Sequence, residues 1–282
     1  MALTLEPNKA VEPLPSRVIA QAPARRIGSF DKFYGWLPLL ALLGMWELVS
    51  DLGLVRPFLL PSLSSVLVRI YTDAQEGDLI ANLGQTLWRT LLGFGISGVL
   101  GVTIGLLMVR VRAVNWLFDP LVSIGFPMPK IAFLPIFVLW LGLYDVSKVT
   151  MIVFNDVFPI ITATVAGVKA VEQQIIWSAR NLGTGERRMM WDILLPAASP
   201  QIITGLQVAL PIALIVAIIT EMSMGGYGIG AVMQNASRMA DSRGVFAGII
   251  EIAVVGYILV KLMSYARARI LRWHSETLHS DH

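Results

Sequence analysis

A chain of 282 residues that is 55% apolar and only 15% charged has too little polar surface for a soluble domain of its size, and its composition is that of a polytopic membrane protein. The net charge of +3 is small, and the sequence gives no signal for nucleic acid binding. The chain has no cysteine, which excludes disulfides, thiolate metal sites and cysteine nucleophiles.

The N-terminal residues 1–35 are largely polar and rich in proline, which predicts a flexible cytoplasmic lead-in. A transmembrane domain is predicted over 36–268, and residues 269–282 are predicted to form a cytoplasmic C-terminal tail that holds every histidine of the chain. A histidine metal site or general base within the membrane is therefore excluded. Apolar runs long enough to span a bilayer occur near 36–53, 89–109, 149–168, 201–221 and 246–265.

The region 113–143 is apolar but contains Pro127, Pro129 and Lys130, so that it forms either one broken or tilted span or two spans. The distribution of positive charge decides between them. With one span here and a cytoplasmic N-terminus, most Lys and Arg residues fall on the cytoplasmic side, whereas two spans would place the Arg-rich segment 170–200 outside. We therefore expect about six transmembrane helices.

The segment 170–200 is a polar island between two apolar runs. Its pattern predicts a helical hairpin, with one short helix over 171–181, chain reversal at Gly183 and a second helix over 185–195 that is closed by Pro196. The exposed face is expected to suit a groove on a soluble partner, and an ordinary interfacial helix is the alternative. That face is predicted to carry Arg180, Glu186, Arg187 and Arg188, with Met189, Met190 and Trp191 among them.

Charged residues within or beside the spans are candidates for a translocation path, because a lipid-facing charge is costly. The alternatives are structural ion pairs and positions at the membrane interface. Lys130 and Asp156, the latter beside Asn155, are predicted to face the path and to be coupled to each other. The remaining charged positions are Glu47, Glu221 and Glu251.

No residue pattern in the chain indicates catalysis or nucleotide binding. No lysine follows a glycine, so that a phosphate-binding Walker A loop is absent, and any ATP must be bound by another chain. The glycines at 225, 226, 228 and 230 follow a predicted span rather than a strand, which favours an outer turn that helps to close a gate. We expect neither a catalytic site nor a metal site.

The chain resembles the permease subunits of binding-protein-dependent ABC importers. The coupling loop of that family is similar to the segment in which Gly183 stands ten residues before Ile193-Leu194-Leu195-Pro196. The resemblance covers most of residues 55–275, and the segments Trp140-Leu141-Gly142 and Gly228-Ile229-Gly230 are similar to the branch for sulfonates, taurine and nitrate. Ala179 and Gly183 match the coupling motif, whereas Trp177 and Ser178 replace its Glu and first Ala.

The resemblance implies a permease fold of the methionine-importer type. It further implies a homodimer in the lipid of a bacterial inner membrane, two cytoplasmic ATPases that bind ATP and Mg, and an external or periplasmic solute-binding protein. The expected solute is a small organic anion such as a sulfonate or taurine; an aromatic carboxylate, nitrate or a pyrimidine precursor is the alternative. An ion-coupled secondary transporter is the other class, but the sequence shows no internal repeat of the kind such carriers have. The residues expected to couple to the ATPase are Ala179, Arg180, Gly183, Glu186, Arg187, Arg188 and Pro196.

Overall fold

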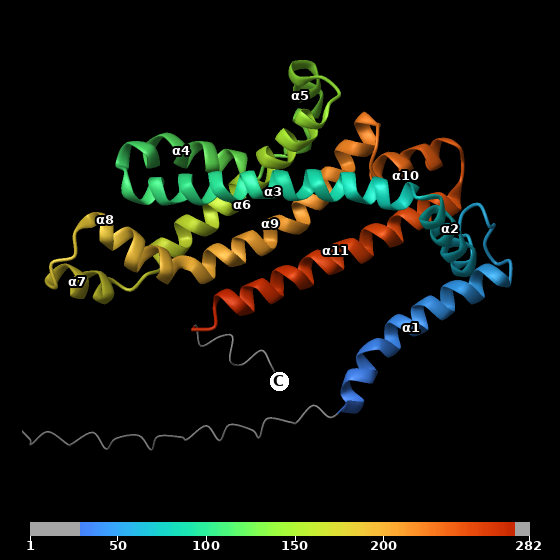
Figure 1. Ribbon diagram of the computed structural model, residues 1–282, viewed down its shortest axis with the longest axis horizontal. Helices are drawn as coiled ribbons and strands as arrows, with labels where there is room; N and C mark the ends of the chain where they lie inside the picture. The colour runs from blue at the N-terminus through green and yellow to red at the C-terminus, as the bar shows by residue number, and fades with distance from the viewer. Residues whose placement is uncertain (1–28, 274–282) are drawn as a thin grey trace, which may run out of the picture.

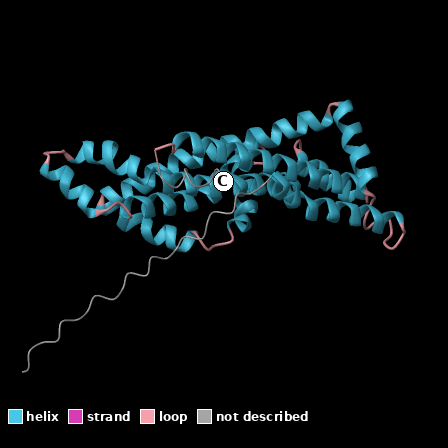
Figure 2. Cartoon of the chain, turned by 90° about the horizontal axis from the view of Figure 1, so that it is seen from below, coloured by secondary structure: helices cyan, strands magenta, loops and turns pink. Residues whose placement is uncertain are grey.

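The computed structural model describes residues 29–273, which form a bundle of helices without strands (Figures 1 and 2). The expected lead-in 1–35 and tail 269–282 lie largely outside the described residues, as do all three histidines. The elements in chain order are α1 (Ser29–Asp51), α2 (Leu63–Glu76), α3 (Asp78–Arg110), α4 (Arg112–Gly125), the 3-10 helix η1 (Lys130–Phe133), α5 (Leu134–Leu141), α6 (Asp145–Lys169), α7 (Gln173–Asn181), α8 (Glu186–Arg188), the π-helix η2 (Met189–Leu194), α9 (Leu195–Met224), α10 (Ile229–Arg238) and α11 (Ser242–Ile270).

Within residues 29–273, four helical stretches are long and apolar enough to cross a membrane: α3, α6, the continuous stretch from α8 through α9, and α11. The pair formed by 112–125 and 130–141 makes a fifth if it counts as one span bent by 100°. These stretches coincide with five of the six spans expected from the sequence. The sixth, 36–53, corresponds to α1, which begins at Ser29 and is not among the helices that meet the spanning criterion.

The bend lies where the sequence places its proline pair. α4 ends at Gly125, and the chain resumes as η1 at Lys130, after Pro127 and Pro129. A proline lacks the backbone N–H that a continuous helix needs, and it disfavours the helical conformation of the preceding residue. As a result α5 leaves the bundle at a steep angle (Figure 1).

The core of the bundle is the packing of α6 between α3 and α9. Glycines of α3 lie against α6 so closely that a Cβ at Gly101 would be 2.7 Å from the Ile160 side chain, and one at Gly105 would be 2.7 Å from Thr164. Gly205 of α9 lies against Ala163 in the same way, with 2.3 Å for its Cβ. Small residues let helix backbones approach, and this close van der Waals packing drives association where lipid surrounds the helices.

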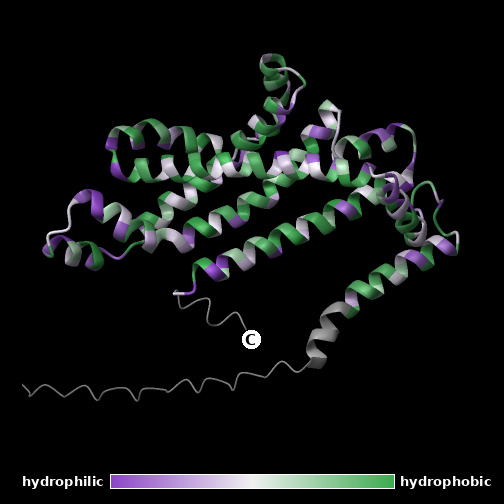
Figure 3. Ribbon diagram, in the orientation of Figure 1, coloured by the Kyte–Doolittle hydropathy of each residue, from purple (hydrophilic) through white to green (hydrophobic). Residues whose placement is uncertain are grey.

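Polar residues collect at the two ends of the bundle, and apolar residues cover its middle (Figure 3). At one end lie α7, α8 and the last turn of α11, and at the other lie α2, α10 and the first turn of α11 (Figure 1). We call these the hairpin end and the α10 end. Many large apolar side chains at mid-bundle are exposed, as lipid contact requires; Leu121, Val208 and Ile258 are examples.

Candidate coupling hairpin and outer polar cluster

The segment between α6 and α9 forms the predicted helical hairpin. α7 covers Gln173–Asn181, and the chain then reverses at Gly183, which has a φ of 79°. The reversal is closed by a hydrogen bond from the Thr184 N–H to the Ala179 carbonyl at 3.1 Å. Glycine adopts a positive φ without strain, and a Cβ at Gly183 would meet nothing within 4 Å. The glycine is therefore required by the backbone conformation and not by crowding.

The exposed face of the hairpin differs in part from the prediction. Arg180, Glu186, Arg187 and Arg188 are exposed as expected, and Arg180 lies 3.5 Å from Glu186. The prediction was wrong for Met189 and Met190, which are buried because η2 turns them toward the bundle. Ala179 is buried as well. The apolar residues that are exposed on the hairpin include Trp177, Leu182 and Trp191.

Pro196 does not close the second helix of the hairpin, and that prediction was wrong. It lies in the first turn of α9, where its missing N–H disrupts little. The preceding six residues, Met189–Leu194, form a π-helix, whose wider turn carries the chain past the proline. One continuous helical stretch of 39 residues therefore runs from Glu186 to Met224.

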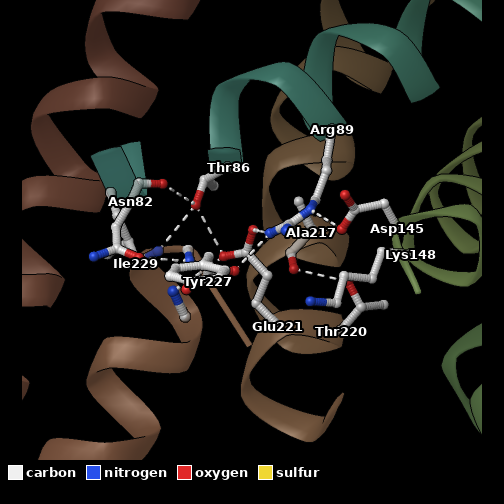
Figure 4. A network of polar contacts seen from close by, with 12 residues as sticks. Asn82, Thr86, Arg89, Asp145, Lys148, Ala217, Thr220, Glu221, Tyr227 and Ile229 are labelled. Atoms are coloured by element: carbon white, nitrogen blue, oxygen red, sulfur yellow. Dashed lines mark hydrogen bonds and ion pairs between the residues drawn. The ribbon is translucent and has the colours of Figure 1, made fainter. Parts of the chain in front are cut away.

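At the far end of that stretch, Glu221 belongs to a group of polar side chains that we call the outer polar cluster (Figure 4). Arg89, Glu221 and Thr86 are buried, whereas Asp145 is exposed. The cluster is centred on Arg89 of α3, which is 3% exposed. Arg89 contacts Glu221 at 2.6 Å and Asp145 at 2.8 Å, and it donates to the Tyr227 carbonyl at 2.7 Å. It thus joins α3, α6 and α9 to the loop before α10.

The same cluster fixes the loop of residues 225–230. Gly225, Gly226 and Gly228 all have positive φ, as the turn requires. Lys148 donates to the Gly225 carbonyl at 2.8 Å. The buried Glu221 carboxylate accepts from the Gly230 N–H at 3.1 Å, and a Cβ at Gly228 would lie 2.3 Å from it. Further bonds come from Thr86 to Glu221 and from the N–H groups of Gly228 and Ile229 to Asn82 and Thr86.

Lys130 and Asp156 are both buried, but they form no ion pair within 4 Å. The Lys130 ammonium donates to the Phe126 carbonyl at 3.1 Å and lies 5.2 Å from the centroid of the Phe158 ring. Both carboxylate oxygens of Asp156 lack a hydrogen-bond partner.

The direction in which Asp156 points follows from its place on α6. Residues 152, 160 and 164 of α6 contact glycines of α3, and Asp156 fills the missing step of that four-residue series. Asp156 therefore lies on the face of α6 that packs against α3. Asn155, the next predicted site residue, is only half-buried.

Sequence reasoning missed Arg89 and Asp145, which complete the cluster around Glu221. Arg89 is on the edge of an apolar run, where a cation commonly lies in the membrane interface, and its spacing to Glu221 gives no signal. One signal was present in the sequence. Thr86 and Thr90 are four residues apart, so they lie on one helix face, which also carries glycines, and polar groups on a packed face need partners. Among the described residues, no group of three or more His, Cys, Asp or Glu side chains is arranged to hold a metal ion.

The architecture is that of a membrane-embedded transport subunit. A helical hairpin lies at one end, the glycine-rich loop of residues 225–230 lies at the other, and a continuous helical stretch joins them. The chain belongs to the family of binding-protein-dependent transport system inner membrane components, whose match covers residues 97–272. It is a permease subunit of an ABC transporter, as its sequence predicted.

Individual relatives are consistent with this assignment. The chain is 30% identical to the taurine transport system permease protein of Escherichia coli strain K12, over 84% of this chain and 88% of that protein. It is 29% identical to a putative aliphatic sulfonates transport permease protein of Bacillus subtilis strain 168, over 86% and 90%. Identity to the formylaminopyrimidine transport permease protein of Halalkalibacterium halodurans is 30%, over 88% and 98%.

Solved structures share the fold. An inward-facing MetNI methionine ABC transporter matches with a TM-score of 0.55 at 18% identity, covering 68% of this chain and 95% of that chain. An amino acid ABC transporter crystallised with histidines matches with a TM-score of 0.59 at 18% identity, covering 72% and 96%. The predicted permease fold of the methionine-importer type is confirmed.

Proposed function

We propose that two copies of this chain form the translocation path of an ATP-driven importer in a bacterial inner membrane. The hairpin of residues 170–200 docks on a cytoplasmic ATPase, which binds ATP and Mg, and the α10 end receives solute from an external binding protein. The chain itself performs no covalent chemistry. Both termini are cytoplasmic in this arrangement, and α11 accordingly ends at the hairpin end.

The observation that carries this proposal is the continuous helical stretch from Glu186 to Met224. It begins with the exposed arginines of the hairpin and ends beside Glu221, which is bonded to the α10 loop. A helical stretch of that length is about 58 Å long, and displacement of one end is conveyed to the other because no loop interrupts it. Movement of the hairpin by an ATPase is thereby conveyed to the outer loop.

The hairpin residues fit such a contact. The hairpin exposes Arg180, Arg187 and Arg188 together with the aromatic side chains of Trp177 and Trp191. Arginine and aromatic residues are enriched in protein interfaces, where a desolvated aromatic anchor is ringed by polar groups. Gly183 sets the angle between the two arms of the hairpin.

For the solute, we propose a small organic sulfonate such as taurine, with a pyrimidine precursor as the second candidate. The names of the relatives support both, and sulfonates are named for two of the three relatives described above.

Reconstitution with the ATPase and the binding protein tests the function. Gly183→Val strains a positive-φ position, and Arg187→Glu reverses a charge on the docking face, so that each is expected to reduce solute-stimulated uptake at least tenfold. Arg112→Gln, which removes an exposed charge at the same end, is the matched control and should transport normally. Near-normal uptake by both hairpin variants contradicts the coupling role.

A further inference from the structure

Two cavities lie beside α4, and their linings differ. The larger, of about 580 Å³, opens between α4 and α6, and the smaller, of about 380 Å³, is lined by residues of the same two helices and by Ile104 and Met128. Val122 and Ile161 line both cavities and separate them. All other side chains around the smaller cavity are apolar or glycine, among them Phe118, Leu121 and Phe158.

The larger cavity is polar at four positions. Asp119 and Ser123 come from α4, and Thr162 and Lys169 come from α6; all four are exposed. Neither Asp119 nor Lys169 forms an ion pair within 4 Å with any residue that the structure describes. The cavity therefore presents one free carboxylate and one free ammonium group. We call it the α4–α6 cavity.

The two charged groups of the cavity lie at different levels along their helices. α4 runs away from the hairpin end, and Asp119 is seven residues into it, about 10 Å deep along the helix axis. α6 runs the opposite way and ends at Lys169, which thus lies at the mouth of the cavity. A carboxylate that faces hydrocarbon is strongly disfavoured. We therefore infer that water or a polar molecule, and not lipid, lies beside Asp119.

We propose that the α4–α6 cavity binds the transported solute, and that the solute is a small zwitterion carrying an ammonium group and a sulfonate or carboxylate. Lys169 contacts the anionic group near the mouth, and Asp119 contacts the ammonium group deeper in. A volume of about 580 Å³ lies within the usual range of small-molecule sites. This inference rests on the proposed transport function and specifies where the solute binds and which solutes fit.

Lys130, Asp156 and Glu221, the buried charges that the sequence marked for the path, are not among the residues that line this cavity. The charged residues of the cavity were not recognised from the sequence, because Lys169 is on the edge of an apolar run and Asp119 stands alone in another. Only the fold brings them to one space.

Thiol accessibility tests the proposal even while the solute is unidentified, because the chain contains no cysteine. Ser123→Cys in the α4–α6 cavity and Leu121→Cys in the apolar cavity are made as single variants of the full chain, purified with its ATPase and placed in nanodiscs. Each is treated with an anionic methanethiosulfonate reagent bearing a sulfonate and with a cationic one bearing a quaternary ammonium. We expect both reagents to modify Ser123→Cys at least tenfold faster than Leu121→Cys, since a thiolate forms only where water enters.

The charges are tested on the Ser123→Cys background. Lys169→Gln should slow the anionic reagent relative to the cationic one by about fourfold, and Asp119→Asn should shift the ratio the other way, as expected for one unit charge at several ångströms in a wet site. Arg112→Gln removes a cation outside the cavity and should leave the ratio unchanged.

Taurine at millimolar concentration should slow modification of Ser123→Cys, and ethanesulfonate, which lacks the ammonium group, should do so several-fold less. Three results would each overturn the proposal. The two cysteines react at equal rates, the ratio of anionic to cationic modification rates is the same in both charge variants as in Ser123→Cys, or taurine and ethanesulfonate protect equally. These readouts require neither uptake nor ATP hydrolysis. If the labelling results fail while the hairpin variants lose uptake as expected, only the solute site is rejected. If the labelling results are as expected while the hairpin variants transport normally, only the proposed function is rejected.

Discussion

At the scale of single residues, the outer polar cluster shows how a membrane protein accommodates buried charge. Arg89 and Glu221 are 3% and 0% exposed, and each would be strongly unfavourable alone. The pair is acceptable because Glu221 receives hydrogen bonds from the Thr86 hydroxyl and the Gly230 N–H as well, while Arg89 also contacts Asp145. Removing one partner therefore costs more than removing both.

Arg89→Met is expected to destabilise the protein by about 3–5 kcal/mol, because it leaves the Glu221 carboxylate buried without its cation. The double variant Arg89→Met/Glu221→Gln should recover a clear part of that loss. Thermal unfolding of the purified chain in detergent measures both. The exposed Arg180–Glu186 pair offers the comparison, and Arg180→Gln should change the midpoint little. Equal losses in the single and double variants would show that the charge pairing is unimportant.

Single residues were predictable from the sequence where the backbone dictates them, and not where a distant partner does. Gly183 was identified because a reversal between two helices favours a residue that tolerates positive φ, and its φ of 79° agrees. Glu221 was recognised as a buried charge, but its partner Arg89 lies 132 positions away, and no local pattern encodes such a distance. The orphan carboxylate of Asp156 likewise appears only once α3 is packed against α6.

The coupling of Lys130 to Asp156 stays a prediction. The Lys130 ammonium is held by backbone carbonyls of its own turn, and the Asp156 carboxylate has no hydrogen-bond partner, so that attraction between the two charges is the remaining source of compensation. We expect Lys130→Met and Asp156→Leu each to reduce uptake, and the double variant to lose less than the sum of the two losses. Uptake in proteoliposomes across this double-mutant cycle is the measurement. Strictly additive losses argue against coupling.

At the scale of elements, the sequence predicted most helices well, because a long apolar run bounded by polar residues has few other solutions in a membrane. α6, expected over 149–168, covers Asp145–Lys169. The prediction failed at Pro196, where a proline was interpreted as a helix end but occupies the first turn of α9 after a π-helix. A π-helix depends on the packing of neighbouring helices and has no sequence signature of its own.

The contact between α3 and α6 depends on glycine at some positions and not at others. In Gly101→Val, the added Cβ would lie 2.7 Å from the Ile160 side chain. This overpacking should lower the free energy of unfolding by about 1–3 kcal/mol. Gly95→Val meets nothing within 4 Å and should be neutral. Melting midpoints and the yield of monodisperse protein from membranes test the pair. A comparable loss for Gly95→Val would mean that the helix needs glycine for its backbone and not for packing.

At the scale of the whole molecule, the two ends of the bundle differ in their polar residues and in how exposed those residues are. The hairpin end exposes arginine and tryptophan side chains on short helices, and the α10 end encloses a charged cluster beneath a glycine-rich loop. The α4–α6 cavity has its mouth toward the hairpin end, because α6 ends there at Lys169. In the proposed function, the hairpin end docks on the ATPase, the α4–α6 cavity holds solute, and the loop of residues 225–230 closes the opposite end.

The orientation of this axis can be measured with single cysteines in the cysteine-free chain. Ser178 is exposed on α7 at the hairpin end, and Ser237 is exposed on α10 at the other. If the hairpin contacts a cytoplasmic ATPase, a membrane-impermeant maleimide should label Ser237→Cys in intact spheroplasts and Ser178→Cys only in inverted vesicles. Both variants should be labelled after detergent is added, which controls for intrinsic reactivity. Labelling of both cysteines from one side would contradict the proposed topology, because the helical stretch of residues 186–224 would then not cross the membrane.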